Sequence, residues 1–551
     1  MRKYLLTGAV VLCGALAGFA LQPLISGDNV FENIKKFDRV LNTALKNYVT
    51  DVDADKMTEA AIKGMLEELD PHSTYISAEE MKAVNEDFSG SFDGIGVEFD
   101  IVNDTLTVVS PIADGPSEKV GIQGGDKIIK VDGQNAIGIS RSDVPKKLKG
   151  PKGTVVVLDV KRSGSKDLIH FSITRDKIPL NSVTSKYILD GTDIGIVAVN
   201  RFMATTNQEL NEALEELQKQ GMKKLVLDLR YNPGGYLDQA FRMADEFLGN
   251  GDTIVYTIGK RPEFNESYVA RGGNKWEDLP IIVLINAGSA SASEIVSGAI
   301  QDQDRGLVIG ETSFGKGLVQ RQYPLGDGSA FRLTISKYYT PSGRCIQRKY
   351  QDKDDYRHLV GRLDLEDGNY IQDAMKKIKE QTKKFNEKAK SDKEKINIDS
   401  LPLFKTKMGR TVFGAGGITP DVIIKSDTIT KLSIDIRGKN LFYQFVEEYL
   451  NTDGKALKEK YHDNFIGFVR NFNVDDKMLQ DLRKLAESKE IKWNDEHAKA
   501  DKDFFQTSIK STIARSIWDR NKSSQVFSLM DKQLMDALKY FPDAVKLVKK
   551  K

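Results

Sequence analysis

The sequence predicts a multidomain α/β protein in which a helical N-terminal region, a β-rich domain, an α/β core with a mixed sheet and a helical C-terminal extension follow one another. Three observations predict this fold class. Apolar residues recur at helical spacing at both ends, short β-rich runs fill residues 86–176, and apolar strands alternate with helical stretches across 177–348. A length of 551 residues exceeds what one domain usually holds, so several folded units are expected.

The composition excludes several classes of protein. A total of 81 Lys and Arg against 79 Asp and Glu is too balanced for nucleic acid to be the main partner. Only two cysteines are present, Cys13 and Cys345, which excludes a disulfide scaffold and a cysteine-rich zinc site. None of the five histidines stands in an HExxH pattern, so a zinc peptidase is not expected, and the sequence calls for no metal or other cofactor.

Residues 1–25 have the pattern of a targeting segment. Arg2 and Lys3 precede a long apolar stretch that contains small residues suited to cleavage. The stretch is also long enough to stay in a membrane as an anchor, so a cleaved signal peptide and an N-terminal tether remain alternatives. A lipoprotein is disfavoured, because Leu12 stands before Cys13 where a small residue is needed. Either way we expect export, to a bacterial-type periplasm or cell envelope.

Residues 26–85 are predicted to form the N-terminal helical region. The apolar residues that recur at three and four are Val30, Ile34, Phe37, Val40, Leu41, Ala44 and Leu45. The pattern breaks at Asp70-Pro71, because proline cannot continue a helix. His72 beside this proline could be catalytic or structural, and its loop position favours a structural role.

The β-rich segment 86–176 carries a resemblance. The stretches 92–96, 116–128 and 131–133 (FDGIG, PSEKVGIQGGDKI and VDG) resemble a PDZ domain. In such a domain, glycines let the backbone turn so that adjacent N–H groups face the terminal carboxylate of a peptide, and the next strand offers its edge to that peptide. The residues predicted to bind it are Gly94, Ile95, Gly96 and Val97. The alternative is a small β-barrel without a ligand.

The remaining segments follow from changes in pattern. Alternating strands and helices predict an α/β core over 177–348, and the lysine-rich residues 349–410 predict a charged insertion. Residues 411–427 are expected to add one more strand to the core sheet. Residues 428–551 are predicted to be helical, with one apolar face formed by Leu441, Phe442, Phe445, Val446 and Tyr449.

The first stretch that could carry chemistry is 227–235 (LDLRYNPGG), a buried strand that runs into a proline-glycine-glycine turn. Such a turn exposes backbone N–H groups at a strand end, which suits the stabilisation of an oxyanion. A tight connection without function would look the same.

The second stretch is 286–295 (NAGSASASEI), where tiny residues lie between a strand and a helix. A serine at this junction lies near unpaired N–H groups and the positive end of the helix dipole, which suits a nucleophile. Ser291 and Glu294 also match a capping box, and this stretch by itself favours a simple cap over a nucleophile.

The third stretch is 310–320, where Lys316 stands between Gly315 and Gly317 among apolar residues. Burial lowers the pKa of a lysine from about 10.4, so that its neutral amine can take a proton from a serine. A phosphate-binding turn is disfavoured, because Gly317 follows the lysine where the Walker pattern needs Ser or Thr.

Together these stretches resemble the C-terminal processing peptidases, or tail-specific proteases, which are serine proteases with a PDZ domain. The alternating Ser-Ala run before Ser-Glu-Ile and the later Gly-Lys-Gly carry the resemblance, as do 339–344 and 418–421, over roughly residues 30 to 425. The resemblance implies that Ser291 is the nucleophile, Lys316 the general base and Gln320 the residue that orients the lysine. It also implies an oxyanion hole formed by the N–H groups of Gly234 or Gly235 and of Ala292. Ser289 and Ser293 remain alternatives to Ser291.

The predicted function is therefore that of an exported serine endopeptidase with a Ser-Lys dyad. Its PDZ domain is expected to recognise protein or peptide substrates that end in free, apolar C-terminal tails. The rivals are an inert PDZ-containing binding protein or chaperone and an acyl-CoA-handling enzyme, against which the lysine, the serine and the export signal argue. Apolar helical faces at both ends predict a homodimer, and the alternative is that both fold back on one monomer.

Overall fold

The computed structural model of the protein describes residues 30–549 apart from 113–114, 163–164, 349–402 and 415. The chain divides into two compact units, one with the residues up to 81 and 320–334, the other with 82–319 and 335–551. The predicted targeting segment 1–25 lies outside the described residues, as does most of the predicted insertion. Within the described ranges, no helix is long and apolar enough to cross a membrane.

The first unit is built on the N-terminal helices. Asp53 begins the second of them, because its carboxylate accepts the N–H groups of Asp55 and Lys56 at 3.0 and 3.2 Å. A short strand then pairs antiparallel with residues 330–332. The elements are α2 (Val30–Asn47), α3 (Ala54–Glu67), β1 (Thr74–Ile76) and the start of α4 (Ala78–Ser89). No residue of α2 is buried, so the apolar stripe predicted for it faces outward.

The β-rich domain of the second unit is an antiparallel sheet of order β3-β4-β5-β7-β8, with β6 on β5. Its strands are β3 (Val97–Val102), β4 (Thr105–Pro111), β5 (Lys127–Val131), β6 (Gln134–Asn135), β7 (Val155–Lys161) and β8 (Ile169–Thr174). Two short helices, α5 (Pro116–Lys119) and α6 (Val144–Leu148), complete it, and β2 (Ser91–Gly94) pairs with β9 (Asp176–Pro179). The inward-facing side chains of alternate strand residues form one buried cluster. Strand β3 lies at the edge of the sheet.

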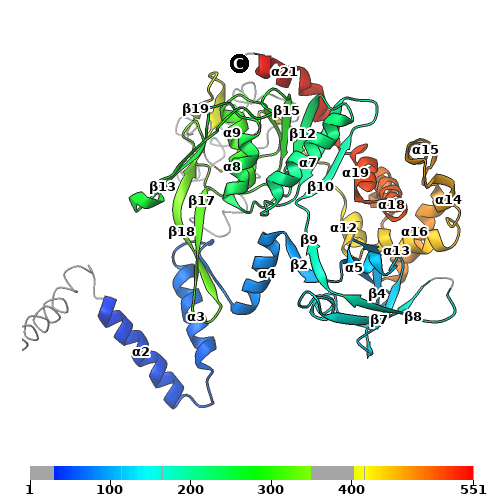
Figure 1. The fold of residues 1–551 in the computed structure, drawn as a ribbon, viewed down its shortest axis with the longest axis horizontal. Helices are drawn as coiled ribbons and strands as arrows, with labels where there is room; N and C mark the ends of the chain where they lie inside the picture. The colour runs from blue at the N-terminus through cyan, green and yellow to red at the C-terminus, as the bar shows by residue number, and fades with distance from the viewer. Residues whose placement is uncertain (1–29, 113–114, 163–164, 349–402, 415, 550–551) are drawn as a thin grey trace, which may run out of the picture. The chain divides into compact units, whose positions relative to one another are not determined.

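The α/β core is a mixed sheet of order β10-β11-β12-β15-β16-β21 (Figure 1). Its strands are β10 (Val183–Ile188), β11 (Ile194–Val199), β12 (Lys224–Asp228), β15 (Ile281–Ile285), β16 (Leu307–Gly310) and β21 (Val422–Ile423). The strands from β11 onward are parallel, whereas β10 is antiparallel to β11. The strand predicted to return within 411–427 is β21.

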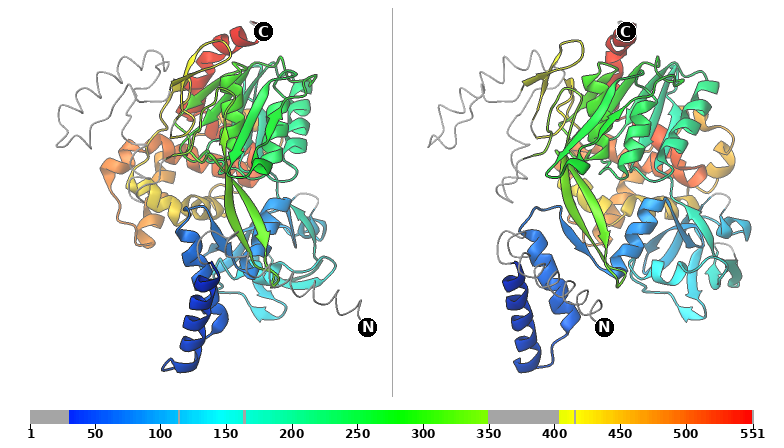
Figure 2. Two further views of the ribbon diagram at one scale, coloured as in Figure 1. Left: turned by 90° about the vertical axis from the view of Figure 1, so that its left-hand side faces the viewer. Right: turned by 60° about the vertical axis from the view of Figure 1, so that its left-hand side comes forward.

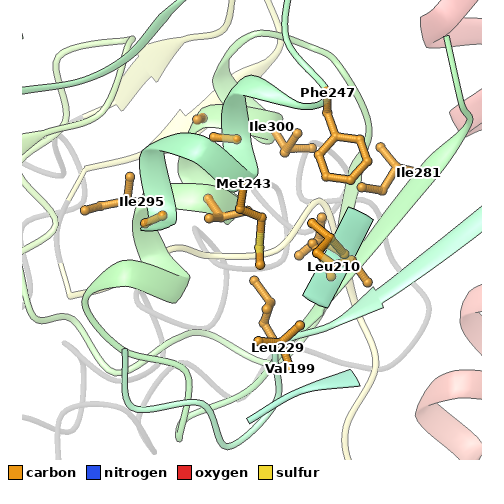
Figure 3. Close-up of a cluster of buried hydrophobic side chains, with 14 of the residues drawn as sticks. Val199, Leu210, Leu229, Met243, Phe247, Ile281, Ile295 and Ile300 are labelled. Carbon is orange, nitrogen blue, oxygen red and sulfur yellow. The ribbon is translucent and has the colours of Figure 1, made fainter. Parts of the chain in front are cut away.

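Helices cover both faces of this sheet. On one face, α7 (Thr206–Lys219), α8 (Leu237–Asp245) and α9 (Ala292–Asp302) bury the cluster drawn in Figure 3. On the other, α20 (Lys532–Ala537), η4 (Leu538–Tyr540) and α21 (Phe541–Lys549) pack against the alternate residues of the same strands. The end of the chain therefore supplies one layer of the core (Figure 2).

Smaller strand pairs flank the core. Strand β13 (Thr253–Gly259) pairs with β14 (Ser267–Val269) and with residues 336–339 of β18 (Ala330–Tyr339), and β17 (Leu318–Pro324) also pairs with β18. A 3₁₀ turn, η1 (Pro262–Phe264), links β13 and β14. Strands β19 (Leu403–Lys405) and β20 (Thr411–Phe413) form a hairpin, so the end of the predicted insertion contributes a strand.

The C-terminal extension has a hydrophobic core of its own. Its helices are α12 (Lys431–Gly438), α13 (Leu441–Asn451), α14 (Leu457–Tyr461), α15 (Phe465–Asn471), α16 (Asp476–Ser488), α17 (Asp495–Ala500), α18 (Lys502–Ile517) and α19 (Arg520–Ser528). The predicted apolar face of α13 lies inside this core, with Tyr449 packed at its margin. The C-terminal face is thus covered within one chain and is not the unpaired surface that the sequence suggested. The predicted fold class is confirmed.

Candidate active site

Three loops that follow neighbouring parallel strands carry the predicted site. Residues 229–235 follow β12, 286–291 follow β15, and 311–317 follow β16. Because the carboxyl ends of parallel strands lie at one edge of a sheet, this topology brings the three predicted stretches together.

Ser291 stands directly before α9, in an unusual backbone conformation. Its φ of 54° and ψ of −111° differ from the extended conformation of an ordinary helix N-cap. Ser291 and Glu294 form a capping box, in which the Glu294 carboxylate accepts the Ser291 N–H at 2.8 Å. The Glu294 N–H also donates to the Ser291 carbonyl oxygen at 2.9 Å. A non-glycine residue in such a strained position is typical of functional sites. A simple cap would not need this strain.

The two neighbouring serines have structural partners. The Ser289 hydroxyl donates to the Leu229 carbonyl oxygen at 2.8 Å, and the Ser293 hydroxyl donates to that of Asn232 at 2.9 Å. Both side chains are fully buried, while Ser291 is half-buried. The geometry therefore favours Ser291 over either alternative as the residue that a substrate can reach.

Glu294 holds the backbones of Ser291 and Lys316 with a single oxygen. Its Oε2 accepts the N–H of Ser291 at 2.8 Å and that of Lys316 at 2.9 Å, and Oε1 accepts the N–H of Gly315 and the hydroxyl of Ser313. Complete burial raises the pKa of Glu294, against the opposing effect of these hydrogen bonds. The sequence indicated Glu294 only as a capping residue, and its position on a fully buried helix is the signal that could have shown more.

Tyr338 also contacts both Ser291 and Lys316, and no pattern in the sequence indicated this role. Its hydroxyl lies 2.6 Å from the Lys316 carbonyl oxygen and 3.2 Å from that of Ser291. Burial raises the pKa of Tyr338 well above its usual value, so the phenol stays protonated as a donor. Glu294 and Tyr338 thus fix the serine and the lysine relative to each other.

The glycines beside Lys316 are required by close backbone approach. A Cβ atom at Gly317 would lie 2.8 Å from the Gln347 nitrogen, and one at Gly315, whose φ is 90°, would lie 3.0 Å from the Gly416 carbonyl carbon. Larger residues would push the lysine out of this position. Gln320 lies in β17, in the first unit, where its side-chain amide donates to the His72 carbonyl oxygen.

The proline-glycine-glycine turn packs against Ser291. A Cβ atom at Gly234 would lie 2.8 Å from the Ser291 Cβ, and one at Gly235 would lie 2.0 Å from the Phe202 carbonyl oxygen. The Gly234 N–H already donates to Asn232 Oδ1 at 2.9 Å. The N–H groups of Gly235 and Ala292, in contrast, make no hydrogen bond with any described residue. Of the predicted oxyanion donors, Gly235 and Ala292 are therefore the available pair.

The predicted peptide-binding loop has a partly different shape from the expected one. Gly94 belongs to strand β2 and is paired with Asp176, so the turn depends on Gly96, whose φ is 72°. Ser117 fixes the loop, because its N–H and hydroxyl both donate to the Ile95 carbonyl oxygen. The N–H groups of Ile95 and Gly96 contact no acceptor among the described residues. They lie next to edge strand β3, as a peptide site requires.

Metal ligation finds no support in the described part of the chain. No group of three or more His, Cys, Asp or Glu side chains is placed there to hold an ion. The arrangement described above offers a serine, a lysine and free backbone N–H groups, which are the components of acyl transfer by a nucleophilic residue.

Comparison with known proteins agrees with this chemistry. Family models match as peptidase family S41 over residues 193–356, a PDZ domain over 107–162, an activating protease CtpB N-terminal domain over 22–80, and a family of unknown function over 433–519. The carboxy-terminal-processing protease of Bartonella bacilliformis is 42% identical over 323 residues, which are 58% of this chain and 74% of the relative. The carboxy-terminal processing protease CtpA of Bacillus subtilis is 34% identical over 467 residues, which are 80% of this chain and 96% of the relative.

Among solved structures, the photosystem II D1 C-terminal processing protease is 32% identical, with 56% of this chain and 82% of that chain covered and a TM-score of 0.32. The long alignments with the two curated relatives establish the family. The chain belongs to the carboxy-terminal processing proteases of peptidase family S41 and is a serine-type peptidase with a PDZ domain.

Proposed function

We propose that this protease cleaves its substrates through a dyad of Ser291 and Lys316. The neutral amine of Lys316 takes the proton of the Ser291 hydroxyl as its oxygen attacks the scissile carbonyl carbon. The resulting lysine ammonium then protonates the leaving amine, so that the peptide bond breaks and an acyl-enzyme remains. Water hydrolyses this ester, with Lys316 again as the base, and releases Ser291.

The oxyanion of each tetrahedral intermediate would be bound by the N–H groups of Gly235 and Ala292. This assignment follows from their lack of other acceptors among the described residues and from the contact of the adjacent Gly234 with Ser291. Ala292 is also the first residue of α9, so its N–H points from the positive end of a helix dipole.

The observation that carries the proposal is the shared anchoring of the two residues. One oxygen of Glu294 and the hydroxyl of Tyr338 each contact the backbones of both Ser291 and Lys316. Catalysis needs a nucleophile and a base that are held together before substrate arrives, and these shared backbone contacts support that role for Ser291 and Lys316.

The test is proteolysis of an unfolded polypeptide by the full chain. Ser291→Ala and Lys316→Ala should each lower turnover by at least about a thousandfold. Ser267→Ala and Lys337→Ala, at exposed positions of β14 and β18, are the matched controls and should keep wild-type activity. Normal cleavage by Ser291→Ala would refute the dyad. Binding without cleavage by the wild-type chain would favour the inert binding protein instead.

We propose that Gln320 orients Lys316. This role requires the Gln320 side-chain amide to leave the His72 carbonyl oxygen, which it contacts in this structure. Gln320→Ala should then lower kcat and shift the pH dependence of kcat, since the base would lose a partner. An unchanged pH profile would remove Gln320 from the mechanism.

We further propose that the PDZ domain selects substrates by a free carboxylate and apolar terminal side chains. Ile95 and Gly96 supply N–H groups that contact no acceptor among the described residues, and edge strand β3 can extend its sheet with the peptide. A peptide with a free apolar C-terminus should be cut faster than its amidated form. Equal rates for the two peptides would show that the carboxylate is not recognised.

Two further parts of the proposal concern location and assembly. Residues 1–25 are proposed to export the protein, which N-terminal sequencing of the protein from separated cell fractions would test and which would also distinguish cleavage from tethering. The exposed apolar face of α2 is proposed to form a homodimer. Light scattering that gives the mass of one 61.5 kDa chain at micromolar concentration would contradict it.

A further inference from the structure

Arg230 connects the end of β12 to the turn that carries Gly235. Its side chain is 13% exposed and forms a bidentate ion pair with Asp228, with Nε 2.9 Å from Oδ1 and Nη2 2.6 Å from Oδ2. The backbone N–H of Arg230 also donates to Asp228 Oδ1 at 3.0 Å. The first residue of the turn is therefore tied to the last residue of the strand.

The other side of the Arg230 guanidinium is held by the far end of the chain. Nη1 and Nη2 lie 3.0 and 2.6 Å from the two carboxylate oxygens of Asp531, and Nη1 lies 3.1 Å from Gln533 Oε1. The Arg230 guanidinium thus forms hydrogen bonds with two carboxylates. Together they fix the orientation of the guanidinium better than one carboxylate would. Burial opposes the charge on Arg230, but these carboxylates outweigh it and raise the pKa of the guanidinium.

Asp531 is itself firmly placed. Its carboxylate caps α20 by accepting the Leu534 N–H at 3.0 Å, and α20 packs through Leu534 on the core sheet. Gln533 donates to the Ile424 carbonyl oxygen at 2.7 Å, directly after β21. The contact on Arg230 therefore comes from a fixed part of the core rather than from a loose tail.

The turn beyond Arg230 needs such support, because it is strained. Tyr231 has a φ of 59°, which is unfavourable for a residue with a side chain, whereas Gly234 and Gly235 can adopt their positive φ values because they have no Cβ. Side-chain amides hold the rest of the turn: Asn286 Oδ1 accepts the Tyr231 N–H and Asn232 Oδ1 accepts the Gly234 N–H. At Arg230 itself, the support comes from Asp228 and Asp531.

We propose that Asp531 is a positioning residue for catalysis, which acts through Arg230 to hold the Gly235 N–H where the oxyanion forms. The C-terminal region thereby takes part in the reaction without contact with substrate. This inference rests on the proposed function, because it assumes that Gly235 donates to the oxyanion.

The experiment compares full-length variants in kcat, KM, thermal stability and affinity for a peptide aldehyde. The aldehyde forms a hemiacetal with Ser291 and places an oxygen in the oxyanion hole, so its Ki reports on that hole. Asp531→Asn keeps a residue that caps helices well, but it removes the negative charge that contacts Arg230. Asp536→Asn is the matched control, since it lies on the same helix and pairs only with Lys539 among the described residues.

Asp531→Asn and Asp531→Ala should lower kcat about tenfold to a hundredfold and weaken aldehyde binding by a similar factor, with KM unchanged. Asp531→Glu should recover part of the loss, because it restores the carboxylate. Asp536→Asn should remain within about twofold of wild type.

The inference is overturned if a folded Asp531→Ala protein keeps its kcat, or if only KM changes, or if activity falls only in proportion to the folded fraction. A failure of this inference can be distinguished from a failure of the proposed dyad. If Ser291→Ala is inactive while Asp531→Ala is fully active, the dyad stands and the positioning role alone is wrong.

Discussion

The helices at the two ends of the chain have similar apolar stripes, yet they bury them to very different extents. In α2, Phe31, Ile34 and Val40 are 60%, 59% and 61% exposed, whereas Leu534 and Phe541 of the C-terminal helices are 2% and 3% exposed. The sequence predicted an unpaired face at both ends. Periodicity identifies which residues share a face, but not whether that face packs on the same chain or on another. The C-terminal helices therefore have a structural role in the core, whereas the exposed face of α2 is the surface for which we propose self-association.

The strongest test of this comparison replaces one buried and one exposed phenylalanine. Phe541→Ala should lower the free energy of unfolding by about 3–5 kcal/mol, because it leaves a cavity between α21 and the core sheet. Phe37→Ala, at 47% exposure on α2, should change it by less than about 0.5 kcal/mol. Denaturant unfolding of both variants measures the difference. Equal losses of unfolding free energy in the two variants would mean that the two ends contribute equally to stability.

Self-association should respond in the opposite way. Ile34→Asp places a charge on the exposed face of α2 and should weaken the proposed dimer by about 1.5–3 kcal/mol, the contribution of one buried apolar side chain. Sedimentation analysis across protein concentrations gives the dissociation constant. Asn33→Asp, at an exposed position on the same helix, adds the same single charge and is the control, and an equal effect of both variants would count against an apolar interface.

Low pH should destabilise the C-terminal core by protonating the carboxylate of Asp501. Burial favours the neutral form of Asp501, but hydrogen bonds from Thr430 and Ser433 outweigh it and lower the pKa of Asp501. A lowered pKa in the folded state gives stability that is present above about pH 4 and is lost as the pH falls through the folded pKa.

Asp501→Asn should therefore cost about 1 kcal/mol at neutral pH, and its difference from wild type should shrink in acid. Unfolding curves at several pH values check this. A difference that stays constant down to pH 3 would show that the charge is not responsible.

The smallest expected effect concerns the contact of the C-terminal helices with the PDZ domain. Arg515 of α18 pairs with Glu98 of β3, and both side chains are about one third or more exposed. Arg515→Ala should cost only about 0.2–1 kcal/mol, because exposed ion pairs contribute little. Lys510→Ala on the same helix is a control outside this pair. A loss above about 2 kcal/mol would mean that this interface stabilises the fold far more than its exposure indicates.

The sequence predicted the buried elements well, because a hydrophobic run between turn signals determines a strand. Strands β5 and β7 lie in the predicted β-rich segment 86–176, and β11 lies in the predicted α/β core. The sequence signal is weaker for β10, since Thr184 and Lys186 interrupt its apolar pattern at the edge of the sheet. Within the site, the loops and their glycines could be recognised from local sequence. The contacts of Glu294, Tyr338 and Asp531 could not, because each depends on residues brought together only by the folded sheet.

The position of β21, α20 and α21 late in the chain has a consequence for when the core can be completed. A ribosome delivers Ser291 and Lys316 long before residues 422–423 and 532–549, which add the edge strand and one whole layer of the sheet. Until these residues are present, the face of the sheet that they cover stays exposed and Arg230 lacks its contact with Asp531. The core that carries Ser291 and Lys316 is therefore complete only after residues 532–549 have packed on its sheet.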